Sequence, residues 1–452
     1  MPAQQAPRAG IDLSILAERH ATALRIAYLA CIAIATLLGL GFDATPSAVL
    51  QRLHRALVPT LHFRDVVDGA RNIALFFGWG ATYVLTAPAP TTRGIVVRAT
   101  LLGLLASVTV ETAQLFSSHR QASLVDVWTN TVGSLLGALM LLIVERRAIS
   151  AMRRGTMIGV PGWLPAGAML LTAFGLAFAP SSRAAHVVSW SASPLERARR
   201  VIESAAAVLP WTSLVTDAAV WLMVGLAVAV ATGDAAGRIR QRQLLAWCVI
   251  APGLLAIAHL GRAMVGLQRE AWAWQVQAAA LLCGLTLGLA LVPRWRALVT
   301  ARSRRALQMA ALAAALGLLM SWWPASWVVS SGRGMRLSVA QLVPMLSLFQ
   351  RDDMSSVFLV LQKAGLGAAL GACLAARRRL GRPVPGIIAA VGFAALLEVG
   401  QLLVPGRYPD VTDILITAAA ASLMLTLVER ADRGVRRIHS GSSGLEWTSH
   451  SR

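Results

Sequence analysis

Charged side chains are scarce in this chain of 452 residues, of which 14% are Asp, Glu, Lys or Arg and 56% are hydrophobic. Soluble proteins carry about 25% charged residues. The mean hydropathy is +0.62. This composition excludes an ordinary soluble domain and predicts a polytopic membrane protein.

Lysine is almost missing, because Lys363 is the only one and the net charge of +21 comes from arginine. Arginine accumulates in the cytoplasmic loops of membrane proteins. No basic run is interleaved with aromatic residues that could stack on bases, so nucleic acid is not expected as a partner.

Signatures of common cofactors and catalytic centres are also missing. The chain has no Walker loop, no HExxH motif and no GxSxG motif, so neither a cofactor nor a metal site is expected. The four cysteines lie in apolar segments without CxxC spacing. They predict neither a disulfide framework nor a zinc site.

Long apolar runs are what the sequence does contain. A transmembrane helix needs about 20 mostly apolar residues, and the fold class predicted here is an all-α bundle of about twelve such helices. The expected spans are residues 23–41, 72–87, 94–116, 125–144, 162–180, 213–231, 243–260, 273–292, 306–328, 355–375, 386–404 and 411–428. Residues 46–57 and 194–208 are expected to form amphipathic helices in the membrane interface.

The distribution of arginine predicts the orientation of these spans. Short loops at residues 146–154, 294–305 and 377–382 carry several arginines each. The loops around Arg120 and Arg407 carry one each. The positive-inside rule therefore predicts both termini in the cytoplasm, with Arg120 and Arg407 outside.

A polar signature, E-x-x-Q-x5-R-x5-D, occurs twice inside the apolar segments. Its members are Glu111, Gln114, Arg120 and Asp126 in the first copy and Glu398, Gln401, Arg407 and Asp413 in the second. Such a duplication predicts four-helix repeats. The expected divisions are a cytoplasmic segment 1–22, a first repeat 23–145, a degenerate middle repeat 162–292, a second recognisable repeat 306–428 and a disordered cytoplasmic tail 429–452.

Each signature predicts a polar cluster at a helical hairpin. Glu111 and Gln114 share one helix face, and Asp126 shares a face with Asn130, because residues three or four apart are neighbours on a helix. Arg120, in the turn, could reach either helix. Charges inside membrane segments are costly, and are usually functional or paired.

Three interpretations of the cluster stay open. Arg120 could neutralise a carboxylate and close the hairpin, the cluster could bind a polar headgroup, or the acids could perform acid–base catalysis. The first copy is the better candidate for an active site, because Asn130, Gly133 and Gly137 are replaced in the second by Thr417, Ala420 and Met424. Lys363 lies within an expected span and needs a partner or a water-filled cavity. Counting back from the Glu of each copy pairs Asn72 with Leu359.

The residues around the first signature resemble the VanZ-like family of bacterial membrane proteins. They read E-T-A-Q-L-F, then Arg120, then S-L-V-D-V-W-T-N-T-V-G. The preceding R-N-I-A-L-F-F-G-W-G is similar to the family's second helix, with Gly78 in place of the usual proline. The resemblance covers residues 25–144 well and 306–428 in a weaker form.

The resemblance implies a place in the inner (cytoplasmic) membrane of a bacterial cell envelope rather than a reaction. Family members are linked to low-level resistance to the glycopeptide teicoplanin, and others lie in envelope and exopolysaccharide gene clusters. The expected partners are the lipid bilayer and a lipid-linked glycan or peptidoglycan precursor, whose headgroup would be recognised at the outer leaflet. Alternatives are a secondary transporter and a membrane-embedded enzyme that uses its carboxylates. The sequence does not specify an oligomeric state.

Overall fold

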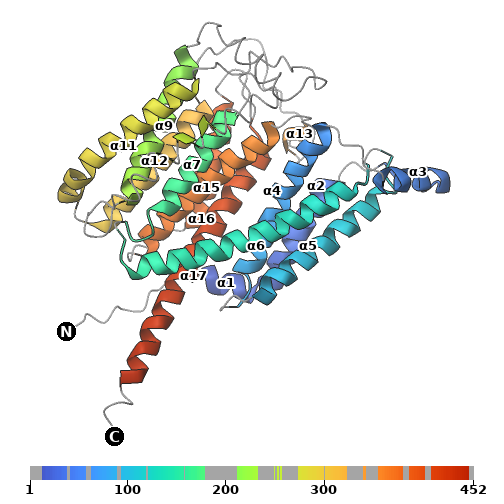
Figure 1. Ribbon diagram of the computed structural model, residues 1–452, viewed down its shortest axis with the longest axis horizontal. Helices are drawn as coiled ribbons and strands as arrows, with labels where there is room; N and C mark the ends of the chain where they lie inside the picture. Colours follow the sequence, from blue (N-terminus) through green and yellow to red (C-terminus); the bar gives the residue numbers. More distant parts are fainter. Residues whose placement is uncertain are drawn as a thin grey trace. The chain divides into compact units, whose positions relative to one another are not determined.

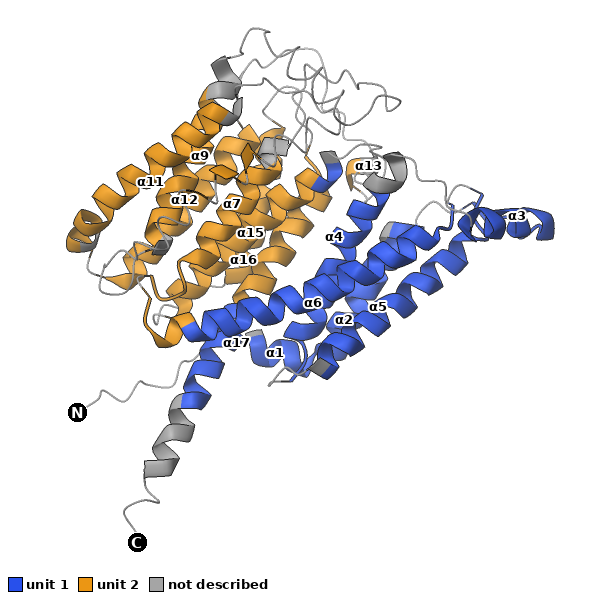
Figure 2. Ribbon diagram, viewed as in Figure 1, with its two compact units in different colours: residues 1–150, 343–357, 426–452 blue, residues 151–342, 358–425 orange. Residues whose placement is uncertain are grey.

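The protein is all-α, as the sequence predicts. The computed structural model describes residues 13–37, 41–57, 63–88, 93–118, 121–156, 158–178, 211–232, 249, 252–253, 255–256, 273–299, 301–322, 339–342, 355–379, 386–402 and 409–446. These residues form helices and one isolated β-bridge, between Phe42 and Ser117 (Figure 1). The chain divides into two compact units, which Figure 2 colours separately.

The first unit comprises residues 1–150, 343–357 and 426–452. It contains the amino-terminal helices α1 Leu13–Arg19, α2 Ala21–Leu37, α3 Pro46–Leu57, α4 Phe63–Leu85, α5 Arg93–Gln114 and most of α6 Leu124–Arg153. Helices α2, α4 and α5 pack against one another. Their core is built around the buried rings of Phe76 and Trp79, and the Trp79 indole N–H donates to the Ala99 carbonyl at 3.0 Å.

The second unit comprises residues 151–342 and 358–425. Its helices are α7 Trp163–Phe178, α9 Trp211–Thr232, α11 Ala273–Leu298, α12 Arg302–Trp322, α13 Val339–Leu342, most of α15 Ser355–Arg379, α16 Gly386–Gln401 and the first part of α17 Val411–Glu446. Helix α9 packs against α7, α11 and α12, and α12 packs against α16. The expected span at 243–260 lies almost entirely outside the described residues.

The outer faces of these helices fit a bilayer. Six of the described helices are long and apolar enough to cross a membrane, and further apolar helices are shorter. On α5, Leu101 and Leu105 are 57% and 62% exposed. Leucine rows of this kind are stable when lipid covers them. The helices therefore confirm a multi-pass membrane protein in contact with lipid.

Helix α3 forms where the sequence predicts an amphipathic helix, at Pro46–Leu57. Leu50 and Leu57 are exposed on it, whereas Arg52 pairs with Asp43 and donates to the Leu115 carbonyl at 3.1 Å. Hydrogen bonds from Thr45, together with Arg52, lower the pKa of Asp43 to about 2, so this tether stays charged at neutral pH. The other expected amphipathic helix, at 194–208, lies outside the described residues.

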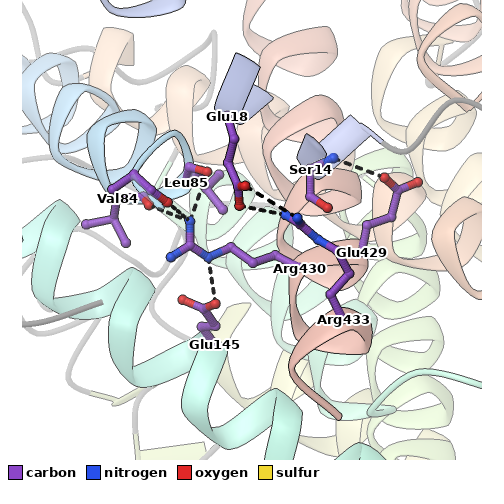
Figure 3. A network of polar contacts seen from close by, with 9 residues as sticks. Ser14, Glu18, Val84, Leu85, Glu145, Glu429, Arg430 and Arg433 are labelled. Carbon is purple, nitrogen blue, oxygen red and sulfur yellow. Dashed lines mark hydrogen bonds and ion pairs between the residues drawn. The ribbon is translucent and has the colours of Figure 1, made fainter. Parts of the chain in front are cut away.

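The prediction of a disordered tail from residue 429 is wrong for most of that segment, because α17 continues to Glu446. Polar contacts within the first unit stabilise this part of α17 (Figure 3). Arg433 pairs with Glu18 at 2.8 Å, and the Ser14 amide donates to Glu429 at 3.3 Å. Serine and glycine in the tail suggested disorder, but these contacts stabilise helix instead.

Candidate functional site

In the first polar cluster, Glu111 links the end of α5 to the start of α6. Its Oε2 accepts a hydrogen bond from the Ser123 backbone amide at 2.8 Å. Ser123 precedes the first residue of α6, and its hydroxyl oxygen accepts from the Val125 amide at 3.1 Å. Ser123 is therefore the N-cap of α6, and Glu111 fixes that cap to the preceding helix.

The second cluster contains the same link at matching positions. Glu398 Oε2 accepts from the Asp410 backbone amide at 3.1 Å, and Asp410 Oδ1 accepts from the Thr412 amide at 2.8 Å. Asp410 caps α17 as Ser123 caps α6. In each hairpin, the described hydrogen bond between the two helices joins a glutamate side chain to the backbone amide of the helix cap. The sequence did not predict this hydrogen bond.

Within the first cluster, the polar side chains are buried. Glu111, Gln114 and Asn130 are 8%, 7% and 2% exposed. Asn130 Nδ2 donates to the Ser107 hydroxyl at 2.8 Å, and Gln114 Nε2 donates to the Thr36 carbonyl at 3.4 Å. Asn130 Oδ1 is buried and has no hydrogen-bond partner among the described residues. Buried polar atoms are nearly always satisfied, so this acceptor can take a hydrogen bond from a donor that the described residues do not supply.

Asp126 and Arg120 are the two remaining members of the first signature. Asp126 lies in the first turn of α6, where a negative charge is favoured, and it is partly exposed. Arg120 lies outside the described residues. The pairing of Arg120 with a carboxylate therefore stays a prediction.

In the second cluster, Lys363 lies between the two acids of the signature. Its Nζ is 2.6 Å from Glu398 Oε1 and 2.9 Å from Asp413 Oδ2, and all three side chains are buried. Gln401 Nε2 also donates to Glu398 Oε1, at 3.0 Å, and Arg407 lies outside the described residues. The sequence indicated that Lys363 needs a partner but did not identify these acids. A useful signal was present, since the chain's only lysine falls in the same repeat.

Helix packing shows which residue of the first copy corresponds to Lys363. An atom added at Gly80 of α4 would collide with the Ser134 carbonyl, and one added at Gly371 of α15 would collide with the Ala421 carbonyl. Ser134 and Ala421 both lie eight positions after the aspartate of their signature. Gly80 and Gly371 are therefore equivalent points of close helix approach.

Eight positions before these glycines lie Asn72 and Lys363. Lys363, rather than Leu359, is thus the counterpart of Asn72. Counting back from the glutamates missed this by one helical turn, because 39 positions separate Asn72 from Glu111 and 35 separate Lys363 from Glu398. The two clusters share the same helix packing and the same signature positions, but the second has the ammonium group of Lys363 where the first has the amide group of Asn72.

A third buried polar network lies at the end of α4 (Figure 3). Arg430 Nε donates to Glu145 Oε1 at 2.7 Å. Its Nη1 donates to the carbonyls of Val84, Leu85 and Ala87 at 2.9, 3.1 and 2.6 Å. A guanidinium satisfies the last carbonyls of a helix and complements its dipole. This network therefore has a structural explanation and is not a candidate ligand site. Among the described residues, no group of His, Cys, Asp and Glu side chains could hold a metal ion.

Comparison with known protein families gives one result. The family model described as VanZ/LLP1 matches residues 25–145 and 308–430. The matches cover more than half of the chain, contain both polar clusters and confirm the two repeats and the resemblance inferred from the sequence. Neither the curated proteins nor the solved structures that were compared gave a match.

Proposed function

The chain belongs to the VanZ/LLP1 family, and on that premise we propose that its first polar cluster binds the headgroup of a lipid-linked or glycan compound. The protein would act in the bacterial cell envelope, at the outer leaflet of the inner membrane. The headgroups of peptidoglycan and exopolysaccharide precursors would fit a role in glycopeptide resistance or in polymer export.

The open acceptor of Asn130 is the observation that carries this proposal. Asn130 Oδ1 is buried beside the hairpin without a hydrogen-bond partner among the described residues, and an unsatisfied buried polar atom costs about 1–3 kcal/mol. A headgroup hydroxyl or amine donating to it would recover that free energy. The second cluster offers less to a ligand, because Lys363 already bridges its two carboxylates.

Retention of a headgroup compound during purification tests the proposal. Wild-type protein, extracted in mild detergent, should carry a non-protein mass in native mass spectrometry, and Glu111→Gln should carry at least about tenfold less. Hydrogen bonds to charged groups contribute about 1.5–3 kcal/mol, and 1.4 kcal/mol is tenfold in affinity. Glutamine still offers an oxygen to the Ser123 amide, so the hairpin link is kept.

A matched control is Thr112→Val, because Thr112 is exposed and, among the described residues, its hydroxyl bonds only the Val108 carbonyl of its own helix. This variant should retain the compound. A wild-type protein without any bound compound, or a Glu111→Gln protein that keeps it in full, would refute headgroup binding at the first cluster.

The proposal also requires the cluster to face outward, with both termini in the cytoplasm. In a variant without native cysteines, a cysteine at position 120 should react with an impermeant thiol reagent applied to intact spheroplasts. A cysteine at position 146, exposed near the other end of α6, should react only after permeabilisation. The reverse pattern would contradict this orientation.

A further inference from the structure

We infer that the first cluster takes the primary ammonium group of its ligand, in the position that Lys363 Nζ occupies in the second cluster. The inference rests on the proposed function and names the chemical class of the group that is bound. The second repeat serves as the internal reference, because it shows how this scaffold holds an ammonium group.

The reference geometry is well defined. Lys363 Nζ donates to Glu398 Oε1 at 2.6 Å and lies 2.9 Å from Asp413 Oδ2. An ammonium has three N–H donors and no acceptor, and two of its donors are used by carboxylates from two different helices. The acids thus form a receptor for a compact cation that can donate in two directions.

The first cluster has the same two acids at the signature positions, without the lysine. Glu111 and Asp126 occupy the signature positions of Glu398 and Asp413, and Glu111 makes the same bond to its helix cap. At the lysine position stands Asn72, which is 8% exposed and cannot neutralise a carboxylate.

The buried carboxyl group of Glu111 also favours a cationic ligand. In the part of the chain that the structure describes, Glu111 forms no ion pair. Arg71, which precedes Asn72 in the chain, binds Asp68 at 2.9 Å and the Ser356 hydroxyl at 2.7 Å. Buried charges are stable when they are paired, and a ligand ammonium would pair with Glu111. The open Asn130 Oδ1 would accept a further hydrogen bond from the same headgroup.

The chemistry predicts discrimination between amines. A primary ammonium can donate to both carboxylates at the short distances seen around Lys363. A trimethylammonium group has no N–H and is bulkier, so it cannot make either bond. An N-acetylated amine loses the charge altogether. The ammonium could belong to an aminophospholipid or to a free amine, which a binding experiment can separate.

Thermal unfolding of the purified full-length protein provides the experiment. Phosphatidylethanolamine should stabilise the wild-type protein. Its apparent binding should be at least about tenfold tighter than that of phosphatidylcholine or N-acetyl phosphatidylethanolamine, which corresponds to about 1.4 kcal/mol of binding free energy. Stabilisation by free ethanolamine as well would show that the amine alone is sufficient. Stabilisation by the lipid alone would identify the aminophospholipid as the source.

Asn72→Lys supplies the ammonium from within the chain. This variant should unfold at the same temperature as wild type or higher and should not respond to phosphatidylethanolamine, whereas Asn72→Gln should still respond. The wild-type comparison of lipids needs no variant and stands if Asn72→Lys does not fold.

Two results would overturn the inference: equal stabilisation by phosphatidylcholine, or no stabilisation by either amine probe. The proposed function has a separate outcome. A compound that depends on Glu111 but carries no primary amine would leave headgroup binding intact and refute the ammonium alone. A protein with no Glu111-dependent compound would refute headgroup binding itself.

Discussion

Replacing Lys363 with methionine should destabilise the protein by about 3–5 kcal/mol, the range for breaking a buried ion pair by removing one partner. Methionine has a similar length but leaves Glu398 and Asp413, both buried, without the cation between them. Denaturant unfolding of the purified protein in detergent measures the loss, and immunoblotting of membranes should show lower abundance.

The same cluster allows a rescue experiment. The triple variant Lys363→Met, Glu398→Gln, Asp413→Asn removes all three charges and keeps amide groups near the Asp410 backbone amide. It should recover most of the lost stability, because neutral replacement of a buried ionic set is far less costly than leaving charges uncompensated. A Lys363→Met protein as stable as wild type would mean that water, not Lys363, stabilises these carboxylates.

Replacing Arg430 with methionine should have an effect of similar size, about 3–5 kcal/mol. The change leaves Glu145 buried without its partner and removes the hydrogen bonds to three carbonyls at the end of α4. Unfolding in detergent again provides the measurement.

Arg436 is a matched control on the same helix. Its side chain is 60% exposed and pairs with Asp432 one turn away, and exposed pairs of this kind contribute about 0–1 kcal/mol. Arg436→Met should therefore be nearly neutral. Equal losses in Arg430→Met and Arg436→Met would contradict the structural role assigned to the Arg430 network.

The helices and the hairpin residues could be predicted from sequence because their signals are local. Apolar length predicts the spans, a 3.6-residue period predicts α3, and identical spacing in two segments predicts paired clusters. The positions of Glu111 and Glu398 near the ends of α5 and α16 follow from these patterns. Their bonds to the helix-cap amides do not, because a backbone amide carries no sequence signature.

Contacts between distant helices were harder to predict. Lys363 and its acids are separated by 35 and 50 positions, and their meeting depends on the register in which α15 packs beside α17. Gly371 sets that register by its close approach to Ala421, as Gly80 does for α4 and α6. The number of residues between Asn72 and Glu111 differs from that between Lys363 and Glu398, so residue counting does not reveal the register. Arg430 was missed for another reason: arginine near the expected cytoplasmic end of a span looks like an orientation signal, whereas it binds the end of α4.

We propose that the two clusters have the same arrangement of signature residues but different roles, the first binding a ligand and the second neutralised by Lys363. Native mass spectrometry of the matched variants Glu111→Gln and Glu398→Gln tests it most directly. We expect Glu111→Gln to lose the bound compound at unchanged protein abundance. We expect Glu398→Gln to keep the compound, although less of the protein could accumulate in the membrane. Equal loss of the compound from both variants at unchanged abundance would contradict this division and would indicate two equivalent sites or one composite site.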